Sequence, residues 1–355
     1  MKLLMYGVNK ETVMKEDVDK YLLTEADKRI QMFDISKITG VDEIVVLTDN
    51  FRNEYYLYVD EEIFSHGEFL RYLAGKTDKT LQEIILETYS KFNEDVLRHL
   101  FELTSGYLSD PSGSFEAIRT AEYALEFANT IRTSGTVVCK MFQKAIYLGY
   151  GLKLEGEIKP LNLSQLSNYI YLLQENMTDL DKKNYLVSGS DLEVYFLTKV
   201  LLYAGAQTIT IIQKNETEST KQFEQIKNLF NEIELTRIHP ATSKSLFYRL
   251  SKADAAIVDS SELNIFDERI HDEVSIIRQT KKVQYIVDTS EESLENVESS
   301  DLDLRYIDGT IPVSYNEEEQ DAAFVAFDEE LNQRIDAFME YLQGLQNNKT
   351  KEMTY

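Results

Sequence analysis

The spacing of apolar positions along this chain follows one pattern in the first half and another in the second half. Period-two runs bounded by turn residues predict strands in the first half, and apolar residues at spacings of three and four predict helices. A capping box at Thr80 predicts one long helix from there to about Leu103. The other predicted elements are strands at residues 2–8, 42–48 and 54–59, the last two forming a hairpin, and helices at residues 11–29, 114–131 and 137–154.

The second half repeats one pattern, in which a short apolar strand is followed by a helix. It begins at Asn184 with a strand, a tight turn, a helix that ends at Gly205, and a second strand. Strands that alternate regularly with helices favour a parallel sheet covered on both faces. The remaining predictions are helices at residues 161–178, 218–230, 241–251 and 268–277, and strands at residues 234–239, 255–260 and 283–288.

An apolar stripe spaced three and four apart, from Phe324 to Leu345, predicts a C-terminal amphipathic helix that starts near Glu317 and frays after Asn347. The predicted fold class is therefore α/β. It comprises a small ferredoxin-like α/β domain at residues 1–160, a Rossmann-like parallel-sheet domain at residues 161–310, and a long C-terminal helix at residues 311–355.

The turn after the strand at Asn184 lacks two of the three glycines of a dinucleotide site. Such a turn reads G-x-G-x-x-G, because glycines let the backbone approach the pyrophosphate and let the helix pack closely. Here those places hold Gly189, Asp191 and Val194. We expect Asp191 to cap the helix N-terminus and to repel a phosphate. The turn therefore predicts an altered nucleotide site formed by Gly189, Ser190 and Asp191.

Composition narrows the function classes. With 37 Lys and Arg against 62 Asp and Glu, the net charge is −25, which argues against binding of tRNA or other polyanions. The single cysteine, Cys139, excludes an intramolecular disulfide and any zinc site built on several cysteines, and no metal site is predicted. We interpret Cys139 as a buried core thiol, with haem or metal binding as the alternative. No apolar run reaches the length of a membrane span, so a cytoplasmic protein is expected.

Three stretches together resemble the glutamyl-tRNA reductase family, the NADPH-dependent enzymes that open the five-carbon route to tetrapyrroles. Leu4-Met-Tyr-Gly-Val-Asn9 is similar to the opening V-G-L-N of the family. His99-Leu-Phe-Glu-Leu-Thr-Ser-Gly106, continuing to Ser109, and Phe142-Gln-Lys-Ala145 are similar to its H-L-F-x-V-A-S-G-L-D-S and F-Q-K-A segments. Val187-Ser-Gly189 to Ile211 is similar to its dinucleotide-binding segment. The similarity runs through almost the whole chain in the same order.

The departures from the family pattern fall on functional positions. The resemblance implies a nucleophilic cysteine on the link of the hairpin, but Asp49 stands there, between Thr48 and Asn50, and Arg52 is displaced by one residue. A carboxylate that attacked the aminoacyl ester would give an anhydride instead of a thioester. The family segment that helps to hold the glutamyl group, G-E-P-Q, becomes Gly113-Ser-Phe-Glu116.

Other family positions remain. The resemblance implies that His99 and Ser109 lie in the substrate site with Thr48, Asn50 and Arg52. Lys214 occupies the place of the basic residue that would face the 2′-phosphate of NADP(H). The family also has a dimerisation domain after its long helix, so this chain is expected to be a C-terminally shortened member, and its apolar stripe must be covered by its own N-terminal domain or by a second copy in a homodimer.

Three hypotheses follow. The first is a pseudoenzyme linked to haem metabolism, which has kept the fold but lost thioester chemistry and acts as a binding or regulatory protein for a small molecule, with haem as the suggested ligand. The second is an active NADPH-dependent oxidoreductase that uses Asp49 or a water. The third is a structural partner that docks other proteins through its C-terminal helix.

Overall fold

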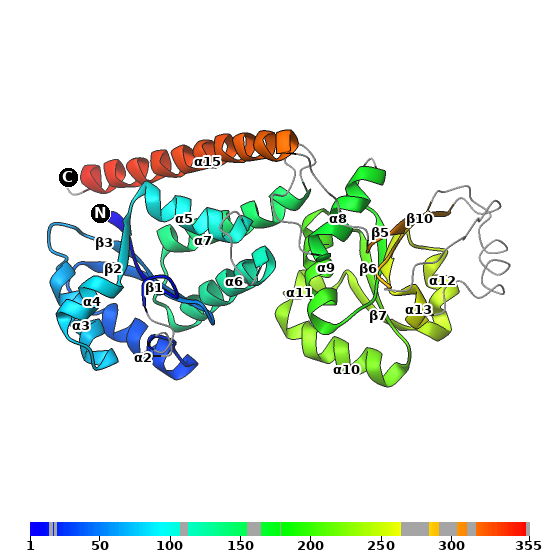
Figure 1. Ribbon diagram of the computed structural model, residues 1–355, viewed down its shortest axis with the longest axis horizontal. Helices are drawn as coiled ribbons and strands as arrows, with labels where there is room; N and C mark the ends of the chain where they lie inside the picture. The colour runs from blue at the N-terminus through cyan, green and yellow to red at the C-terminus, as the bar shows by residue number, and fades with distance from the viewer. Residues whose placement is uncertain are drawn as a thin grey trace. The chain divides into compact units, whose positions relative to one another are not determined.

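A computed structural model describes residues 1–13, 17, 20–106, 113–154, 165–177, 179–263, 284–290, 304–310 and 317–352. The chain divides into two compact units, the first made of Met1–Gly149 with Asp321–Tyr355 and the second of Tyr150–Gln320 (Figure 1). The sequence-based boundaries at residues 160 and 310 stay predictions. Among the described residues, no helix combines the length and the apolar content that a membrane span requires.

The first unit is built on a four-stranded antiparallel sheet with the order β2-β3-β1-β4. Helices α2 and α3 precede β2 and β4 along the chain, which is the β-α-β-β-α-β order of a ferredoxin-like fold, as predicted. The hairpin of two strands is also confirmed. The strands are β1 (Lys2–Asn9), β2 (Val41–Thr48), β3 (Arg52–Val59) and β4 (Tyr89–Phe92), and the helices are α2 (Glu25–Ile35), α3 (His66–Thr77), α4 (Leu81–Glu87), α5 (Glu94–Ser105), α6 (Gly113–Ile131) and α7 (Thr136–Leu154).

The two faces of this sheet carry different helices. On one face Tyr55 bonds Gln31 of α2 and packs against Phe69 of α3. On the other face Tyr56 packs against Phe142 of α7, with ring centroids 5.1 Å apart. Neighbouring residues of a strand point to opposite faces, so the alternation along β3 decides which residues can meet.

The prediction of one long helix from Thr80 to Leu103 is wrong. This segment forms two helices, α4 and α5, which are separated by the edge strand β4, and β4 pairs with β1. The break is fixed at Asn93, which has a left-handed φ of 46° and whose Oδ1 accepts a hydrogen bond from the amide of Leu3. The helix predicted at residues 11–29 is also misplaced, because α2 begins at Glu25.

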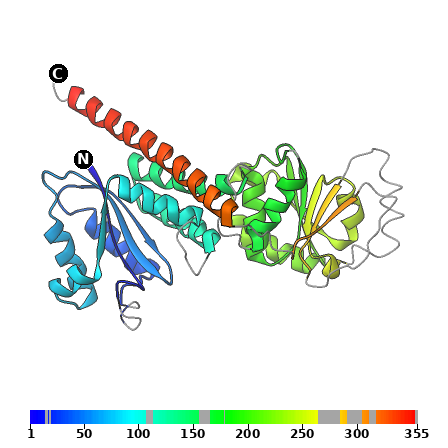
Figure 2. The same cartoon turned by 45° about the horizontal axis from the view of Figure 1, so that its top comes forward.

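Helix α15 (Glu317–Glu352) belongs to the first unit from Asp321 onward and continues past the predicted fraying point. Its apolar stripe is covered within this chain, since Leu331, Ile335, Phe338 and Leu342 are buried. Figures 1 and 2 both show α15 beside α5 and α7. Arg98 of α5 pairs with Asp328 at 2.9 Å.

The second unit is a six-stranded sheet with the order β10-β9-β8-β5-β6-β7, in which every neighbouring pair is parallel. This is the 3-2-1-4-5-6 order of a dinucleotide-binding fold, as the Rossmann-like prediction requires. Helices cover both faces, α8, α9 and α10 on one and α12 and α13 on the other (Figure 1). The strands are β5 (Asn184–Val187), β6 (Thr208–Gln213), β7 (Ile238–Thr242), β8 (Ala255–Val258), β9 (Gln284–Asp288) and β10 (Leu304–Asp308).

Two predicted boundaries in this unit are wrong. The strand predicted at residues 234–239 starts as helix α11, because Asn231 and Glu234 form a capping box, and β7 follows from Ile238. The helix predicted at residues 241–251 is only the short α12. The helix predicted at residues 268–277 lies outside the described residues. The helices are α8 (Gln165–Asn176), α9 (Asp191–Tyr203), α10 (Glu216–Ile226), α11 (Glu232–Leu235), α12 (Leu246–Leu250) and α13 (Ser260–Leu263), with 3-10 turns at Lys227–Leu229 and Ser243–Ser245.

Candidate functional site

The turn between β2 and β3 is organised by Asp49. Its Oδ1 accepts hydrogen bonds from the amides of Phe51 at 2.7 Å and Arg52 at 3.0 Å, and its Oδ2 lies 3.3 Å from Nε of Arg52. A side chain that bonds the backbone two and three residues ahead is a typical turn former. The Thr48 hydroxyl donates to the carbonyl of Arg52 at 3.4 Å, and Asn50 is exposed at the tip. Asp49 is therefore held in place as a turn residue.

Behind this turn lies a buried carboxylate that sequence reasoning missed. Glu54, the third residue of β3, is completely buried, and three polar side chains surround it. Its Oε1 lies 2.8 Å from Nε2 of His99 and accepts from the Tyr89 hydroxyl at 2.6 Å, while its Oε2 accepts from the Tyr56 hydroxyl at 2.6 Å. We call these four residues the Glu54 cluster. The sequence signal that could have found it is a Glu directly before the run Tyr55-Tyr-Leu-Tyr-Val59, because a buried charge must be paired.

The charge of Glu54 is stabilised by its neighbours. Burial alone would raise the pKa of this carboxyl, but the charge and hydrogen bond of His99, followed by the charge of Arg52, outweigh burial and lower the pKa to about 2. Burial and the adjacent carboxylate raise the pKa of Tyr89 and of Tyr56 well above the ordinary value. The cluster is thus ionised at Glu54 and protonated at both tyrosines at neutral pH.

Gly7 allows the cluster to assemble. A Cβ at this position would lie 2.6 Å from the ring of Tyr89 and 3.0 Å from Glu54, so no larger residue fits without displacing them. The structure thus brings Thr48, Asp49, Asn50 and Arg52 together at one hairpin turn, and His99 contacts Glu54, which follows this turn in β3. Ser109 lies outside the described residues, as do the side chains of residues 113–116.

In the second unit, the turn after β5 carries its own carboxylate. Ser190, and not Asp191 as predicted, is the N-cap of α9, because Ser190 forms a capping box with Glu193. Oε2 of Glu193 accepts from the Ser190 amide at 2.8 Å and from its hydroxyl at 2.7 Å. Asp191 is the first helical residue and is exposed. The amide that would face a phosphate is therefore already bonded to a carboxylate.

The rest of this turn is also engaged within the chain. Gly189 has a φ of 141°, and a Cβ there would lie 2.9 Å from the Glu193 carboxylate. The Gly189 carbonyl accepts from Nε2 of Gln213 at 3.1 Å and of Gln222 at 2.9 Å. Lys214 is exposed beyond the end of β6. Because two carboxylates flank the helix N-terminus, these residues do not fit the pyrophosphate of NADP(H).

Cys139 is not the buried thiol that was predicted. It is half-buried near the start of α7, and its Sγ donates to Oδ1 of Asn129 at 3.0 Å. Across the part of the chain that the structure describes, no three His, Cys, Asp or Glu side chains are grouped to hold a metal ion.

Comparison with known proteins gives consistent matches. Residues 6–155 match the family described as "Glutamyl-tRNAGlu reductase, N-terminal domain". Glutamyl-tRNA reductase from an Exiguobacterium strain is 24% identical over 219 residues, which cover 62% of this chain and 49% of that protein. The one from a Picosynechococcus strain is 21% identical over 269 residues, covering 75% and 63%. The chain therefore spans between 49% and 63% of the length of these relatives.

Among solved structures, the glutamyl-tRNA reductase from Methanopyrus kandleri matches 98% of this chain and 82% of its own chain. The sequence identity is 18% and the TM-score is 0.48.

Proposed function

We propose that this chain is a divergent member of the glutamyl-tRNA reductase family, and that it serves tetrapyrrole formation as a binding or regulatory protein and not as a reductase. The observation that carries this proposal is the carboxylate of Glu193 bonded to the Ser190 amide, in the place where a dinucleotide phosphate would bind. A unit charge 4 Å from a phosphate charge costs about 1 to 4 kcal/mol between bulk water and a protein surface, which weakens binding about fivefold to a thousandfold. Hydride transfer would then lack its donor.

The turn at Asp49 supports the same proposal independently. A nucleophile must be free to approach the carbonyl carbon of its substrate. Both carboxylate oxygens of Asp49 already contact groups of the turn, including the amide of Arg52. Covalent capture of an acyl group at this position would break the turn and would give an anhydride.

The groups that remain at this turn favour ligand binding. Arg52 is held by Asp49, and His99 is held by Glu54, so a cation and an imidazole each keep a defined position. Such an arrangement suits a small molecule with a carboxylate, which an arginine binds through paired hydrogen bonds. With a net charge of −25, a small ligand fits better than tRNA.

Haem, the ligand that pathway kinship suggests, would need an axial ligand from this chain. Nε2 of His99 already bonds Glu54, and the Cys139 thiol bonds Asn129. Haem binding through either residue therefore requires that these contacts break. A haem titration of the wild type, His99→Ala and Cys139→Ala tests it, and an unchanged Soret band in the wild type removes this ligand.

NADPH binding separates the proposal from an active oxidoreductase. We expect no saturable change in nicotinamide fluorescence when the protein is titrated with micromolar NADPH, because a thousandfold weakening would move a Kd of about 1 μM to about 1 mM. A family reductase with intact glycines, titrated in parallel, is the positive control. Saturable binding in the micromolar range would overturn the proposal and favour the oxidoreductase.

A further inference from the structure

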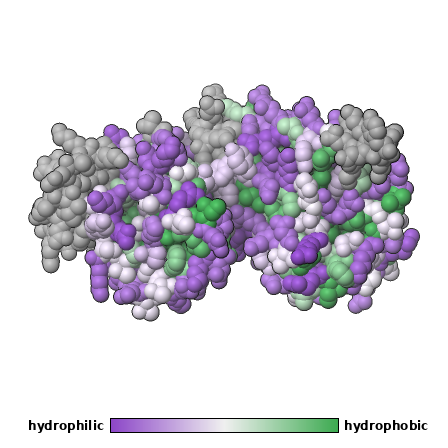
Figure 3. Space-filling model, turned by 180° about the vertical axis from the view of Figure 1, so that it is seen from behind, coloured by the Kyte–Doolittle hydropathy of each residue, from purple (hydrophilic) through white to green (hydrophobic). Residues whose placement is uncertain are grey.

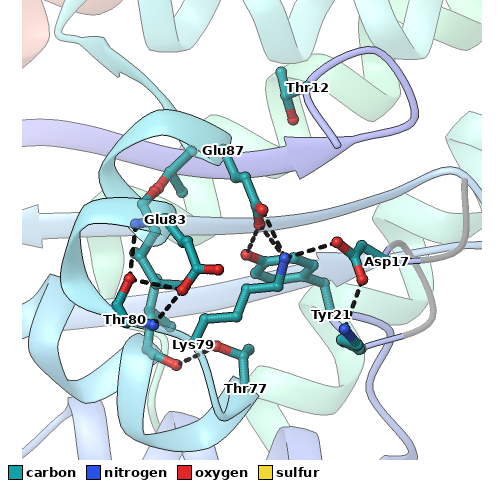
Figure 4. Close-up of polar contacts among 12 residues, drawn as sticks. Thr12, Asp17, Tyr21, Thr77, Lys79, Thr80, Glu83 and Glu87 are labelled. Carbon is teal, nitrogen blue, oxygen red and sulfur yellow. Dashed lines mark hydrogen bonds and ion pairs between the residues drawn. The ribbon is translucent and has the colours of Figure 1, made fainter. Parts of the chain in front are cut away.

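A buried lysine lies in the turn between α3 and α4. The side chain of Lys79 is only 7% exposed, and its Nζ lies 3.0 Å from Oδ2 of Asp17. The same Nζ lies 2.6 Å and 2.7 Å from the two carboxylate oxygens of Glu87. Figure 4 shows the Lys79 amine between these carboxylates and next to the Tyr21 ring. We call these four residues the Lys79 cluster.

The Lys79 cluster differs from the ion pairs of the protein surface. Hydrophilic residues predominate among those that Figure 3 colours, and ion pairs on such a surface contribute little, because water weakens the attraction between their charges. The three N–H donors of Lys79 instead have three carboxylate oxygens within hydrogen-bond distance, and the hydroxyl of the buried Tyr21 donates to the same Glu87. Without the ammonium group, Asp17 and Glu87 would be two neighbouring negative charges. Lys79 therefore holds Glu87, the last residue of α4, in place.

Glu87 is joined to the Glu54 cluster by a single residue. Thr88, the C-cap of α4, is extended, and Tyr89 then begins β4. The Tyr89 hydroxyl donates to Oε1 of Glu54 at 2.6 Å, and its ring lies edge-on to the His99 imidazole, with ring centroids 6.1 Å apart. Successive Cα atoms are only about 3.8 Å apart, so a displacement of Glu87 has little chain in which to be absorbed before it reaches Tyr89.

Strand β4 depends on contacts at both of its ends. It is an edge strand of four residues that pairs with β1. Segments with few contacts open locally more easily than the centre of a sheet. At one end, the Asn93 amide donates to the Leu3 carbonyl at 2.9 Å, and the Leu3 amide donates to Oδ1 of Asn93 at 3.3 Å. At the other end, beside Tyr89, the Lys79 cluster holds the chain through Glu87.

We propose that Lys79 is a positioning residue for the candidate site at the hairpin turn. Through Glu87 it keeps Tyr89 against Glu54, and Tyr89 and Glu54 together keep the His99 imidazole in place. Its effect on ligand binding rests on the function proposed for this turn, whereas the coupling between Lys79 and His99 is present without a ligand. The two can therefore fail separately.

Proton NMR of the histidine rings in the full chain, at neutral pH and without a ligand, measures this coupling. His99 is one of four histidines, and the signals that are missing in His99→Asn identify it. Protons near an aromatic ring are shifted by its ring current, so Tyr89→Leu gives the position of the His99 signals when this ring is absent. Lys79→Met keeps the aliphatic stem and removes the charge. We expect it to move the His99 signals in the same direction as Tyr89→Leu, and to leave those of His239 in the second unit unchanged.

Lys76→Met is the matched control, because Lys76 of α3 pairs with Asp34 instead of Glu87, and its His99 signals should match those of the wild type. Lys79→Gln keeps hydrogen-bond donors without the charge. It should move the His99 signals in the same direction by a smaller amount, and it serves if Lys79→Met does not fold. His99 signals that stay at the wild-type position in the folded Lys79 variant, that move in the direction opposite to Tyr89→Leu, or that move as far in Lys76→Met would each overturn the proposal.

Discussion

Replacement of the buried carboxylate in Glu54→Gln tests the electrostatic account of the first unit. The pKa of Glu54 falls from its ordinary 4.5 to about 2 because His99 and Arg52 outweigh the effect of burial. The pKa of this carboxyl thus differs by about 2.5 between the folded and the unfolded state. At about 1.4 kcal/mol for each pKa unit, this difference contributes roughly 3 kcal/mol to the free energy of unfolding. This agrees with the roughly 3 to 5 kcal/mol that is lost when a buried ion pair is broken.

The sign of the pH dependence follows from the direction of the pKa change. A carboxyl whose pKa is lower in the folded state stabilises the fold above its unfolded pKa, and this contribution disappears as the pH falls from 4.5 toward 2. Glu54→Gln should therefore lose about 3 kcal/mol of unfolding free energy at pH 6 and clearly less at pH 3. For a unit of this size the loss corresponds to a Tm lower by about 6 to 12 °C.

Urea unfolding of both proteins, followed by tyrosine fluorescence at pH 6 and pH 3, measures this difference. Glu61→Gln is the matched control, because Glu61 is an exposed partner of Lys2 and should change the free energy of unfolding by less than about 1 kcal/mol. If Glu54→Gln unfolds like the wild type at pH 6, or if its loss is equally large at pH 3, the reasoning about the cluster is refuted.

Three further substitutions test other contacts. Gly7→Ala should cost about 1 to 3 kcal/mol, because the new methyl group meets the Tyr89 ring, and Tyr89→Leu should restore part of the loss in a double-mutant cycle followed by urea unfolding. Glu43→Gln should cost about 1 to 2 kcal/mol in the same assay, because Glu43 accepts the amides of Val137 and Val138 at the start of α7; an unchanged midpoint would contradict this cap. Leu331→Ala should cost about 2 to 5 kcal/mol by calorimetry, since the side chain is fully buried, and a loss below about 1 kcal/mol would mean that α15 does not pack on the first unit.

Periodicity along the chain predicts the elements whose burial is regular. The hairpin of β2 and β3 and the β5-α9-β6 unit were predicted, because their apolar spacing matches a sheet or helix face. The strand β4 was missed, because the apolar residues on either side of it, from Leu81 to Leu100, happen to continue the helical spacing. What separates the two helices is the backbone at Asn93 and the pairing with β1, and both depend on tertiary structure.

The residues of the candidate site were also hard to predict from the sequence, because their contacts depend on tertiary structure. The Glu54 cluster joins residues 35 and 45 positions apart, at Tyr89 and His99, so no local pattern indicates it. The cap of α9 is a different case, because the sequence Ser190-Asp-Leu-Glu193 is itself a capping-box pattern. That pattern predicts Ser190 as the cap, and the carboxylate in the nucleotide turn could have been predicted from it.

The central proposal, that this protein does not reduce glutamyl-tRNA, is tested most directly by mixing the protein with glutamyl-tRNA and NADPH. NADPH oxidation that depends on glutamyl-tRNA is followed by absorbance. We predict no oxidation above the rate without protein, because Asp49 is fixed in its turn and Glu193 occupies the nucleotide turn. Turnover by the wild type that is lost in Asp49→Asn would contradict the account.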